Sequence, residues 1–285
     1  MPRLRVSAIG YLNTAPLMWS FEHGSSRDEL RRRFEVEYTI PSRCAQLLAD
    51  RSADIGIIPV AAYTTIPGLR ILSDVAIASK QAVRSILLVS NRPIDQIRTV
   101  ALDNSSRSSA ALIQILFAKY WNLDVRFAPA DPELDRMLTQ HDAALLIGDP
   151  ALQVDRSRYL TWDLAEEWRA FTGKPFVFAF WAIRNAAAPE QELAGIGESF
   201  SMSRDAGLRH IPELAGEWAD KLKLSREHIA EYLSENIHYR LDDENIAGMQ
   251  LFFHYAAELR ILPTAPELLL ASASETRNSV SASRF

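Results

Sequence analysis

Three short polar segments, each between an apolar stretch and a helical pattern, carry side chains that could bind a small anion. They contain Asn13 and Thr14, then Ser42 and Arg43, and finally Ser105, Ser106 and Ser108. Each lies where a helix is predicted to begin, and the free N–H groups and partial positive charge of a helix N-terminus suit a carboxylate. Any one segment alone is explained by helix capping. Three together favour a site for carboxylates.

The elements around these segments predict where they meet. Short apolar strands alternate with helical patterns, which is typical of mostly parallel sheets covered by helices. We expect two α/β lobes, residues 1–91 with 182–270 and residues 92–181, joined by crossings near Val89–Arg92 and Ala179–Arg184. Everything after Pro189 is predicted to be helical, and residues 271–285 are predicted to form a flexible tail.

This plan places a ligand cleft between the lobes, where strand ends and helix N-termini face each other. We expect one pocket there, formed by seven residues: Asn13, Ser42, Ser85, Ser105, Ser106, Ser108 and Gly148. Asp149, and Phe176 in the aromatic run PFVFAFWAIR, are expected to border on the same ligand. Arg43 and Arg107 either bind a carboxylate bidentately or face solvent.

Composition excludes several other functions. The chain has 285 residues and a formal net charge of -5, which argues against a surface built for nucleic acid or anionic lipid. No transmembrane-length run or signal peptide is evident, so a cytoplasmic protein is expected. Neither a dinucleotide-binding nor a phosphate-loop motif occurs, and the six histidines and the single Cys44 form no metal-binding pattern, so no metal or cofactor is expected.

An ordered set of motifs between Ile9 and Arg184 resembles one enzyme family. The motifs are IGYLNTAPL, DIGIIPVAAY, SILLVS, LDNSSRSS, LIGDPAL and GKPFVFAFW. In that order and spacing they resemble the chorismate dehydratases of the futalosine route to menaquinone. The resemblance implies a fold like that of type II periplasmic binding proteins, in which two lobes close on a ligand, here with additional C-terminal helices.

The resemblance also implies a cofactor-free elimination. Chorismate would lose its ring hydroxyl and the proton on the ether-bearing carbon, giving water and 3-[(1-carboxyvinyl)oxy]benzoate. Asn13 is expected to orient and polarise this substrate, and Thr14, Arg43, Asp149 and Phe176 are expected to contact it. The proton acceptor stays open between the strand-end carboxylates and the substrate's own carboxylate.

Two alternative functions are weighed against this one. The first is 1,4-dihydroxy-6-naphthoate synthase of the same pathway, whose first polar segment usually contains an acidic residue that Leu12-Asn13-Thr14 lacks. The second is a non-catalytic protein that binds small carboxylates, for which a leader or a helix-turn-helix would be expected. The oligomeric state does not follow from the sequence.

Overall fold

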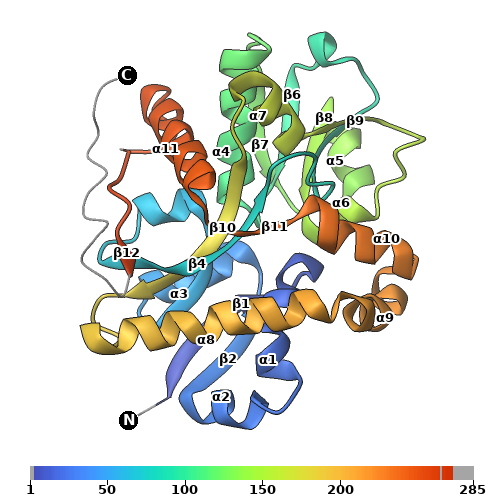
Figure 1. Cartoon of the computed structure of the whole chain (residues 1–285). Helices are drawn as coiled ribbons and strands as arrows, with labels where there is room; N and C mark the ends of the chain where they lie inside the picture. The colour runs from blue at the N-terminus through green and yellow to red at the C-terminus, as the bar shows by residue number, and fades with distance from the viewer. Residues whose placement is uncertain (1–2, 264, 272–285) are drawn as a thin grey trace.

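Two separate β-sheets organise the computed structural model, which describes residues 3–263 and 265–271 (Figure 1). The larger sheet has seven strands in the order β11-β4-β10-β3-β1-β2, with β12 paired to β4. These strands are β1 (Leu4–Ile9), β2 (Phe34–Thr39), β3 (Ile55–Pro59), β4 (Leu69–Ser79), β10 (Phe176–Arg184), β11 (His238–Arg240) and β12 (Leu270–Ala271).

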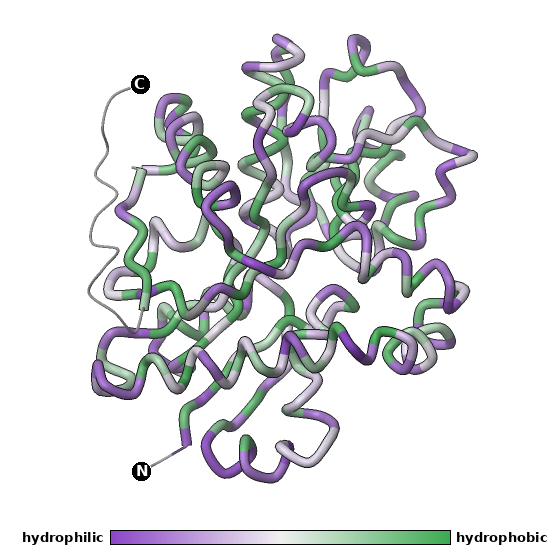
Figure 2. Tube along the Cα trace, in the orientation of Figure 1, coloured by the Kyte–Doolittle hydropathy of each residue, from purple (hydrophilic) through white to green (hydrophobic). Residues whose placement is uncertain are grey.

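The smaller sheet has five strands in the order β7-β6-β8-β5-β9. Its strands are β5 (Ile86–Ser90), β6 (Thr99–Asp103), β7 (Arg126–Ala130), β8 (Ala143–Ile147) and β9 (Leu160–Asp163). The central strands β3 and β10 of the larger sheet and β5 and β8 of the smaller sheet are buried and apolar, and they appear as hydrophobic stretches of the trace in Figure 2. Burial of these strands against covering helices supplies one apolar core that runs through both lobes, with a smaller separate cluster around Leu87, Val89 and Ala101 in the second lobe.

Short helices connect the strands and cover the sheets. In the first half of the chain they are η1 (Leu12–Met18), α1 (Trp19–Glu22), α2 (Arg27–Arg33), α3 (Pro41–Ala49) and η2 (Val60–Thr64). In the second lobe they are η3 (Ile94–Gln96), α4 (Arg107–Ile115), η4 (Leu116–Tyr120), α5 (Leu134–Gln140), α6 (Gly148–Leu152) and α7 (Leu164–Thr172). The predicted alternation of strands and helices is therefore present in both lobes.

The prediction of mostly parallel sheets is wrong. Parallel pairs join β1 to β2 and β3, and β6 to β7 and β8. However, β10 runs antiparallel to both β3 and β4, and β5 runs antiparallel to both β8 and β9. The antiparallel strands β5 and β10 are those next to the crossings between lobes, where the chain direction reverses. Both sheets are consequently mixed.

The chain changes sheet earlier than the predicted lobe boundaries. It leaves β4 at Ser79 and enters the smaller sheet at Ile86, and it returns to the larger sheet after α7, at Phe176. The predicted boundaries at residues 91/92 and 181/182 therefore fall at the end of β5 and inside β10. The division of the chain into one lobe of residues 1–91 with 182–270 and another of residues 92–181 stays a prediction.

The C-terminal part consists mainly of helices that pack on both lobes. It contains α8 (Glu190–Arg209), α9 (Ile211–Leu222), α10 (Arg226–Glu231), the π-helical turn η5 (Tyr232–Asn236) and α11 (Asp243–Glu258). In Figure 1, α8 lies across the larger sheet. Helix α11 contacts both β10 of the larger sheet and α4 of the second lobe. The prediction of helix throughout this part is wrong for β11 and β12, which pair with β4. Of the predicted tail, only Ala271 is among the described residues.

Candidate functional site

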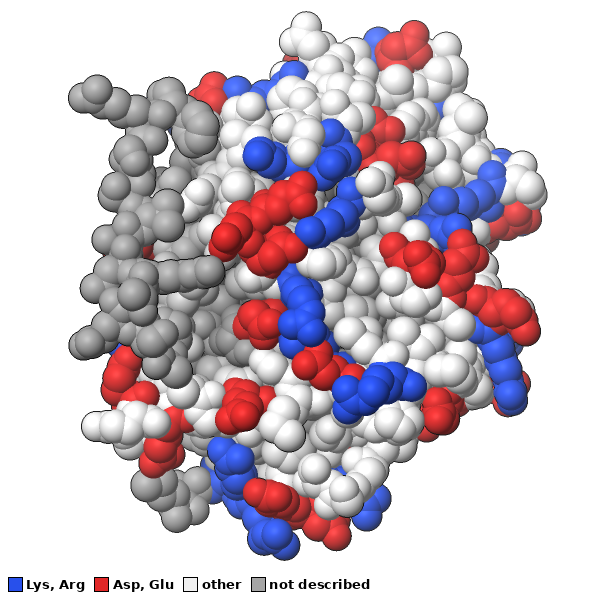
Figure 3. Space-filling view, in the orientation of Figure 1, with Lys and Arg blue, Asp and Glu red and all other residues white. Residues whose placement is uncertain are grey.

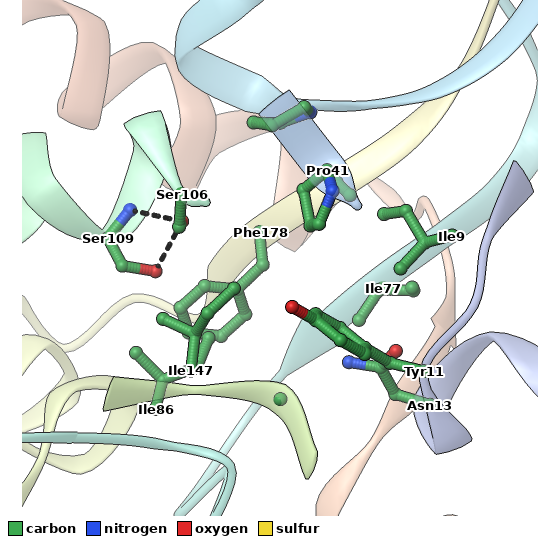
Figure 4. A pocket seen from close by; sticks show the side chains of 13 residues that line it. Ile9, Tyr11, Asn13, Pro41, Ile77, Ile86, Ser106, Ser109, Ile147 and Phe178 are labelled. Atoms are coloured by element: carbon green, nitrogen blue, oxygen red, sulfur yellow. Dashed lines mark hydrogen bonds between the residues drawn. The ribbon is translucent and has the colours of Figure 1, made fainter. Parts of the chain in front are cut away.

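A small pocket lies between the lobes, with a volume of about 40 Å³ (Figure 4). Tyr11 and Asn13 line it from the larger-sheet lobe, and Ser106, Ser109 and Gly148 line it from the other lobe. The rest of its wall is apolar, supplied by Ile9, Pro41, Pro59, Ile77, Ile86, Ile147, Phe178 and Ala179. The site therefore combines an apolar wall with a few polar groups, as small-molecule sites do.

The first polar segment forms the 3₁₀ helix η1 directly after β1. The backbone N–H of Leu12 donates to Asp149 Oδ1 of the other lobe at 3.0 Å. The Thr14 hydroxyl donates to Asn13 Oδ1 at 3.3 Å, and Thr14 is buried and does not line the pocket. No side chain caps η1, so Asn13 is not a capping residue there. Its side chain is instead part of the pocket wall.

Tyr11, which was not predicted from the sequence as a site residue, packs directly on Gly148. Gly148 has a φ of +63°, and a Cβ added to it would lie 2.6 and 2.7 Å from two carbons of the Tyr11 ring. Glycine is therefore required twice, for its backbone conformation and for the close approach of the ring. The Tyr11 hydroxyl points into the pocket (Figure 4), and burial raises its pKa above the ordinary value.

The serine-rich segment follows β6 and is built around Asp103. Its carboxylate accepts hydrogen bonds from the Ser105 N–H and hydroxyl, at 2.9 and 2.5 Å, and from the Ile147 N–H at 3.3 Å. Ser106 is the N-cap of α4, accepting from the Ser109 N–H at 3.2 Å, and its hydroxyl donates to Ser109 Oγ at 3.0 Å. Asp103 therefore holds the loop, whereas Ser106 and Ser109 face the pocket (Figure 4).

Ser108, also in this segment, has a structural role in the contact between lobes. Its hydroxyl donates to the Phe178 carbonyl at 3.2 Å and accepts from the Ala61 N–H at 3.2 Å. Phe178 lines the pocket, whereas Phe176 is 1% exposed and packs on Trp168. The aromatic strand thus presents a different phenylalanine to the pocket from the one that was predicted.

The second polar segment meets the third rather than the pocket. The Ser42 N–H of α3 donates to the Ser105 carbonyl at 3.0 Å, and neither residue is among those that line the cavity. Pro41, the first residue of α3, lines it instead. Arg43 and Arg107 are exposed in the first turns of α3 and α4. A cation at a helix N-terminus is unfavourable for the helix and adds positive potential beside this site.

Asp149 and Ser85 lie just behind the pocket wall. Burial raises the pKa of Asp149 to about 6, although the hydrogen bond from the Leu12 N–H favours its ionised form. The Ser85 carbonyl accepts from the Gly148 N–H at 2.7 Å, and the Ser85 hydroxyl accepts from Tyr232 at 2.8 Å. A buried carboxyl with a raised pKa beside a pocket is a feature of functional sites.

The structure thus brings together part of the predicted set. Asn13, Ser106 and Gly148 line one pocket, while Ser42, Ser85, Ser105 and Ser108 hold its surroundings. Sequence reasoning missed Tyr11, Pro41, Ser109 and Phe178. The sequence offered one signal for Ser109, since it lies three residues after the cap Ser106. The other three depend on tertiary packing.

The described residues contain neither a membrane-spanning helix nor a cluster of metal-binding side chains. No helix within residues 3–263 and 265–271 is long and apolar enough to cross a membrane. In the same part of the chain, no three His, Cys, Asp or Glu side chains are grouped as a metal site would require. Charges of both signs are interspersed over the face shown in Figure 3, without a continuous field of one sign.

Two lobes on separate mixed sheets, with a pocket where they meet, define an α/β protein with the periplasmic-binding-protein fold. Solved structures share this fold. A protein from Archaeoglobus fulgidus matches with a TM-score of 0.71 at 17% identity, over 91% of this chain and 98% of that one. The periplasmic aliphatic sulphonate binding protein SsuA from Escherichia coli matches with a TM-score of 0.63 at 17% identity, over 100% and 99% of the two chains.

The sequence then specifies the family. Residues 4–258 match the model of the menaquinone biosynthesis family, and the chain belongs to that family. The chorismate dehydratase of Thermus thermophilus is 28% identical over 282 residues, which covers 90% of this chain and 94% of that enzyme. The predicted fold and the predicted link to menaquinone biosynthesis are confirmed.

Proposed function

We propose that this protein is a chorismate dehydratase of the futalosine route to menaquinone and acts in the cytoplasm. One observation carries the proposal: in a member of this family, Asn13 of one lobe and Ser106 of the other line the same pocket. The similarity to the Thermus thermophilus enzyme supports the same activity. The reaction removes the ring hydroxyl of chorismate and the proton on the ether-bearing carbon, releasing water and forming an aromatic ring.

Binding follows from the charge of the substrate. Chorismate carries two carboxylates, and the N-terminus of α4 with Ser106 and Ser109 offers hydroxyls and a partial positive charge to one of them. Arg43 and Arg107 add positive charge near the same helix ends. The apolar wall with Phe178 suits the carbon ring. Fixing the substrate in one orientation is then a large part of catalysis.

The proton acceptor is assigned to the substrate. Among the described residues that line the pocket, none is a His, Asp, Glu or Lys. A carboxylate of chorismate held near the C–H bond takes the proton, while Asn13 orients and polarises the substrate. Asp149 follows Gly148 and does not line the pocket. It accepts from the Leu12 N–H and adds negative charge next to the site.

The test is direct turnover. The purified protein is incubated with chorismate without metal ions or nucleotides, and the products are followed by mass spectrometry. Loss of one water from chorismate supports the proposal, and Asn13→Ala is expected to abolish most of that turnover. Unchanged chorismate with a folded wild-type protein overturns it. An Asn13→Ala variant as active as wild type removes Asn13 from the mechanism.

A further inference from the structure

Tyr232 brings a fully buried hydroxyl to the back of the pocket from a part of the chain that the mechanism above does not use. It lies in the π-helical turn η5, is 1% exposed, and donates a hydrogen bond from its hydroxyl to Ser85 Oγ at 2.8 Å. Burial raises the pKa of Tyr232 above its ordinary value, so the hydroxyl keeps its proton and remains a donor. Ser85 directly precedes the pocket residue Ile86.

The surroundings hold this hydroxyl in place. Two neighbours of Tyr232 bind the segment that crosses between the lobes: Glu231 accepts from Arg84 at 2.7 Å, and Asn236 donates to the Ala82 carbonyl at 3.0 Å. Arg84 has a φ of +60°, an unusual conformation for a residue with a side chain. Its N–H donates to the Asp163 carboxylate at 2.6 Å. The crossing segment is therefore fixed from both sides.

The hydrogen bond from Tyr232 determines how the Ser85 hydroxyl can be used. Because Ser85 Oγ accepts from Tyr232, the Ser85 hydroxyl proton is left to donate elsewhere. The Asn13 side chain also interacts with the Tyr232 hydroxyl, which lowers the pKa of Tyr232 against the larger effect of burial. Tyr232 thus joins Asn13 of one lobe to Ser85 at the start of the other, and such chains of hydrogen bonds polarise their members.

We propose that Tyr232 is a positioning residue for the dehydration: its hydroxyl holds Ser85 behind the pocket wall and sets the orientation of the Asn13 side chain, which faces the substrate. The inference rests on the proposed function, because its readout is the turnover of chorismate. It also gives the C-terminal helices a role at the site, since η5 delivers the side chain and, with α10, holds the crossing.

The test removes one oxygen atom from the side chain of Tyr232. Tyr232→Phe keeps the buried ring and removes the hydroxyl, and kcat/KM for chorismate is expected to fall about tenfold, the size expected for losing one buried hydrogen bond and leaving its partner unsatisfied. Tyr239→Phe is the matched control, because Tyr239 is 3% exposed, lies in the adjoining strand β11, and its hydroxyl has no hydrogen-bond partner among the described residues. The control is expected to keep wild-type kinetics.

A double-mutant cycle separates positioning from mere stability. If Tyr232 acts through Ser85, Tyr232→Phe has little further effect on kcat/KM once Ser85→Ala is present. Equal losses in both backgrounds, or a lowered melting temperature with unchanged kinetics, overturn the inference. If wild type turns over chorismate and Tyr232→Phe is equally active, this inference is overturned and the proposed function is not. Wild-type protein that leaves chorismate unchanged overturns the proposed function and, with it, this inference.

Discussion

Gly148→Ala is expected to displace Tyr11 and thereby to disturb the pocket. The added Cβ would lie 2.6, 2.7 and 3.1 Å from three carbons of the Tyr11 ring, whereas ordinary contacts of this kind begin near 3.4 Å. The ring is rigid, so it must move as a whole or the lobes must separate. The φ of +63° adds a backbone cost of roughly 1 to 2 kcal/mol for any residue with a Cβ.

Gly173→Ala isolates the effect of the ring. Gly173 has a φ of +70° at the C-terminus of α7, and a Cβ there would meet no atom within 4 Å. Both variants should therefore lose a similar backbone contribution to the free energy of unfolding, measured in urea. Only Gly148→Ala should also change kinetics, and we expect kcat/KM for chorismate to fall by roughly tenfold to a hundredfold, equivalent to about 1.4 to 3 kcal/mol.

A second substitution tests the cause. Tyr11→Ala removes the ring that the new Cβ would strike, so adding Gly148→Ala to Tyr11→Ala should reduce kcat/KM little further. The reasoning is refuted if Gly148→Ala and Gly173→Ala have the same kinetics. It is equally refuted if the kinetic effect of Gly148→Ala is as large without the Tyr11 ring as with it.

Three further outcomes are expected. Ser106→Ala should weaken chorismate binding by about tenfold to a hundredfold while costing the fold about 0.5 to 2 kcal/mol; a lower melting temperature with unchanged affinity would assign Ser106 to capping alone. Arg43→Gln and Arg107→Gln should lower kcat/KM for chorismate most at low salt, whereas the exposed control Arg126→Gln should not. A loss of kcat/KM that does not depend on salt would contradict electrostatic attraction of the substrate. Burial raises the pKa of Asp149 to about 6, above its unfolded value, so ionisation of this carboxyl lowers the free energy of unfolding as the pH rises from about 4 through 6. Above pH 6, the free energy of unfolding of Asp149→Asn should therefore exceed that of wild type by up to roughly 2 to 3 kcal/mol. Urea unfolding that shows the same difference at every pH would contradict this.

The sequence predicted the architecture because the fold depends on patterns that repeat along it. Apolar runs located most strands of both lobes. Two C-terminal helices begin at residues of the type that favours capping, since Ser225 accepts from the His228 N–H and Asp242 accepts from the Asn245 N–H. Strand direction and the short strand β11 were not predictable in this way. They are set by pairing with β4 and by the crossings, which are tertiary contacts without a local signal.

The site was predictable only as a set of segments. Polar residues after β1 and β6 indicated which loops meet, and Asn13 and Ser106 do line one pocket. The pattern could not show which side chain of each loop turns inward. The Ser105 hydroxyl donates to Asp103 and the Ser108 hydroxyl donates to the Phe178 carbonyl, and neither residue lines the cavity. Local hydrogen bonds thus select the inward-facing residues, and they depend on the assembled fold.

The same segments that are expected to bind the substrate also hold the lobes together. The Leu12 N–H donates to Asp149, and the Ser42 N–H donates to the Ser105 carbonyl, so two helix-terminal donors suited to a carboxylate are occupied across the interface. The pocket of about 40 Å³ is far smaller than the roughly 300 Å³ or more of typical ligand sites. We therefore expect chorismate binding to require separation of the lobes, which would break these two bonds and release both donors. It follows that substitutions at the interface should change the affinity for substrate even where they touch no substrate atom, because they alter the balance between separated and closed lobes.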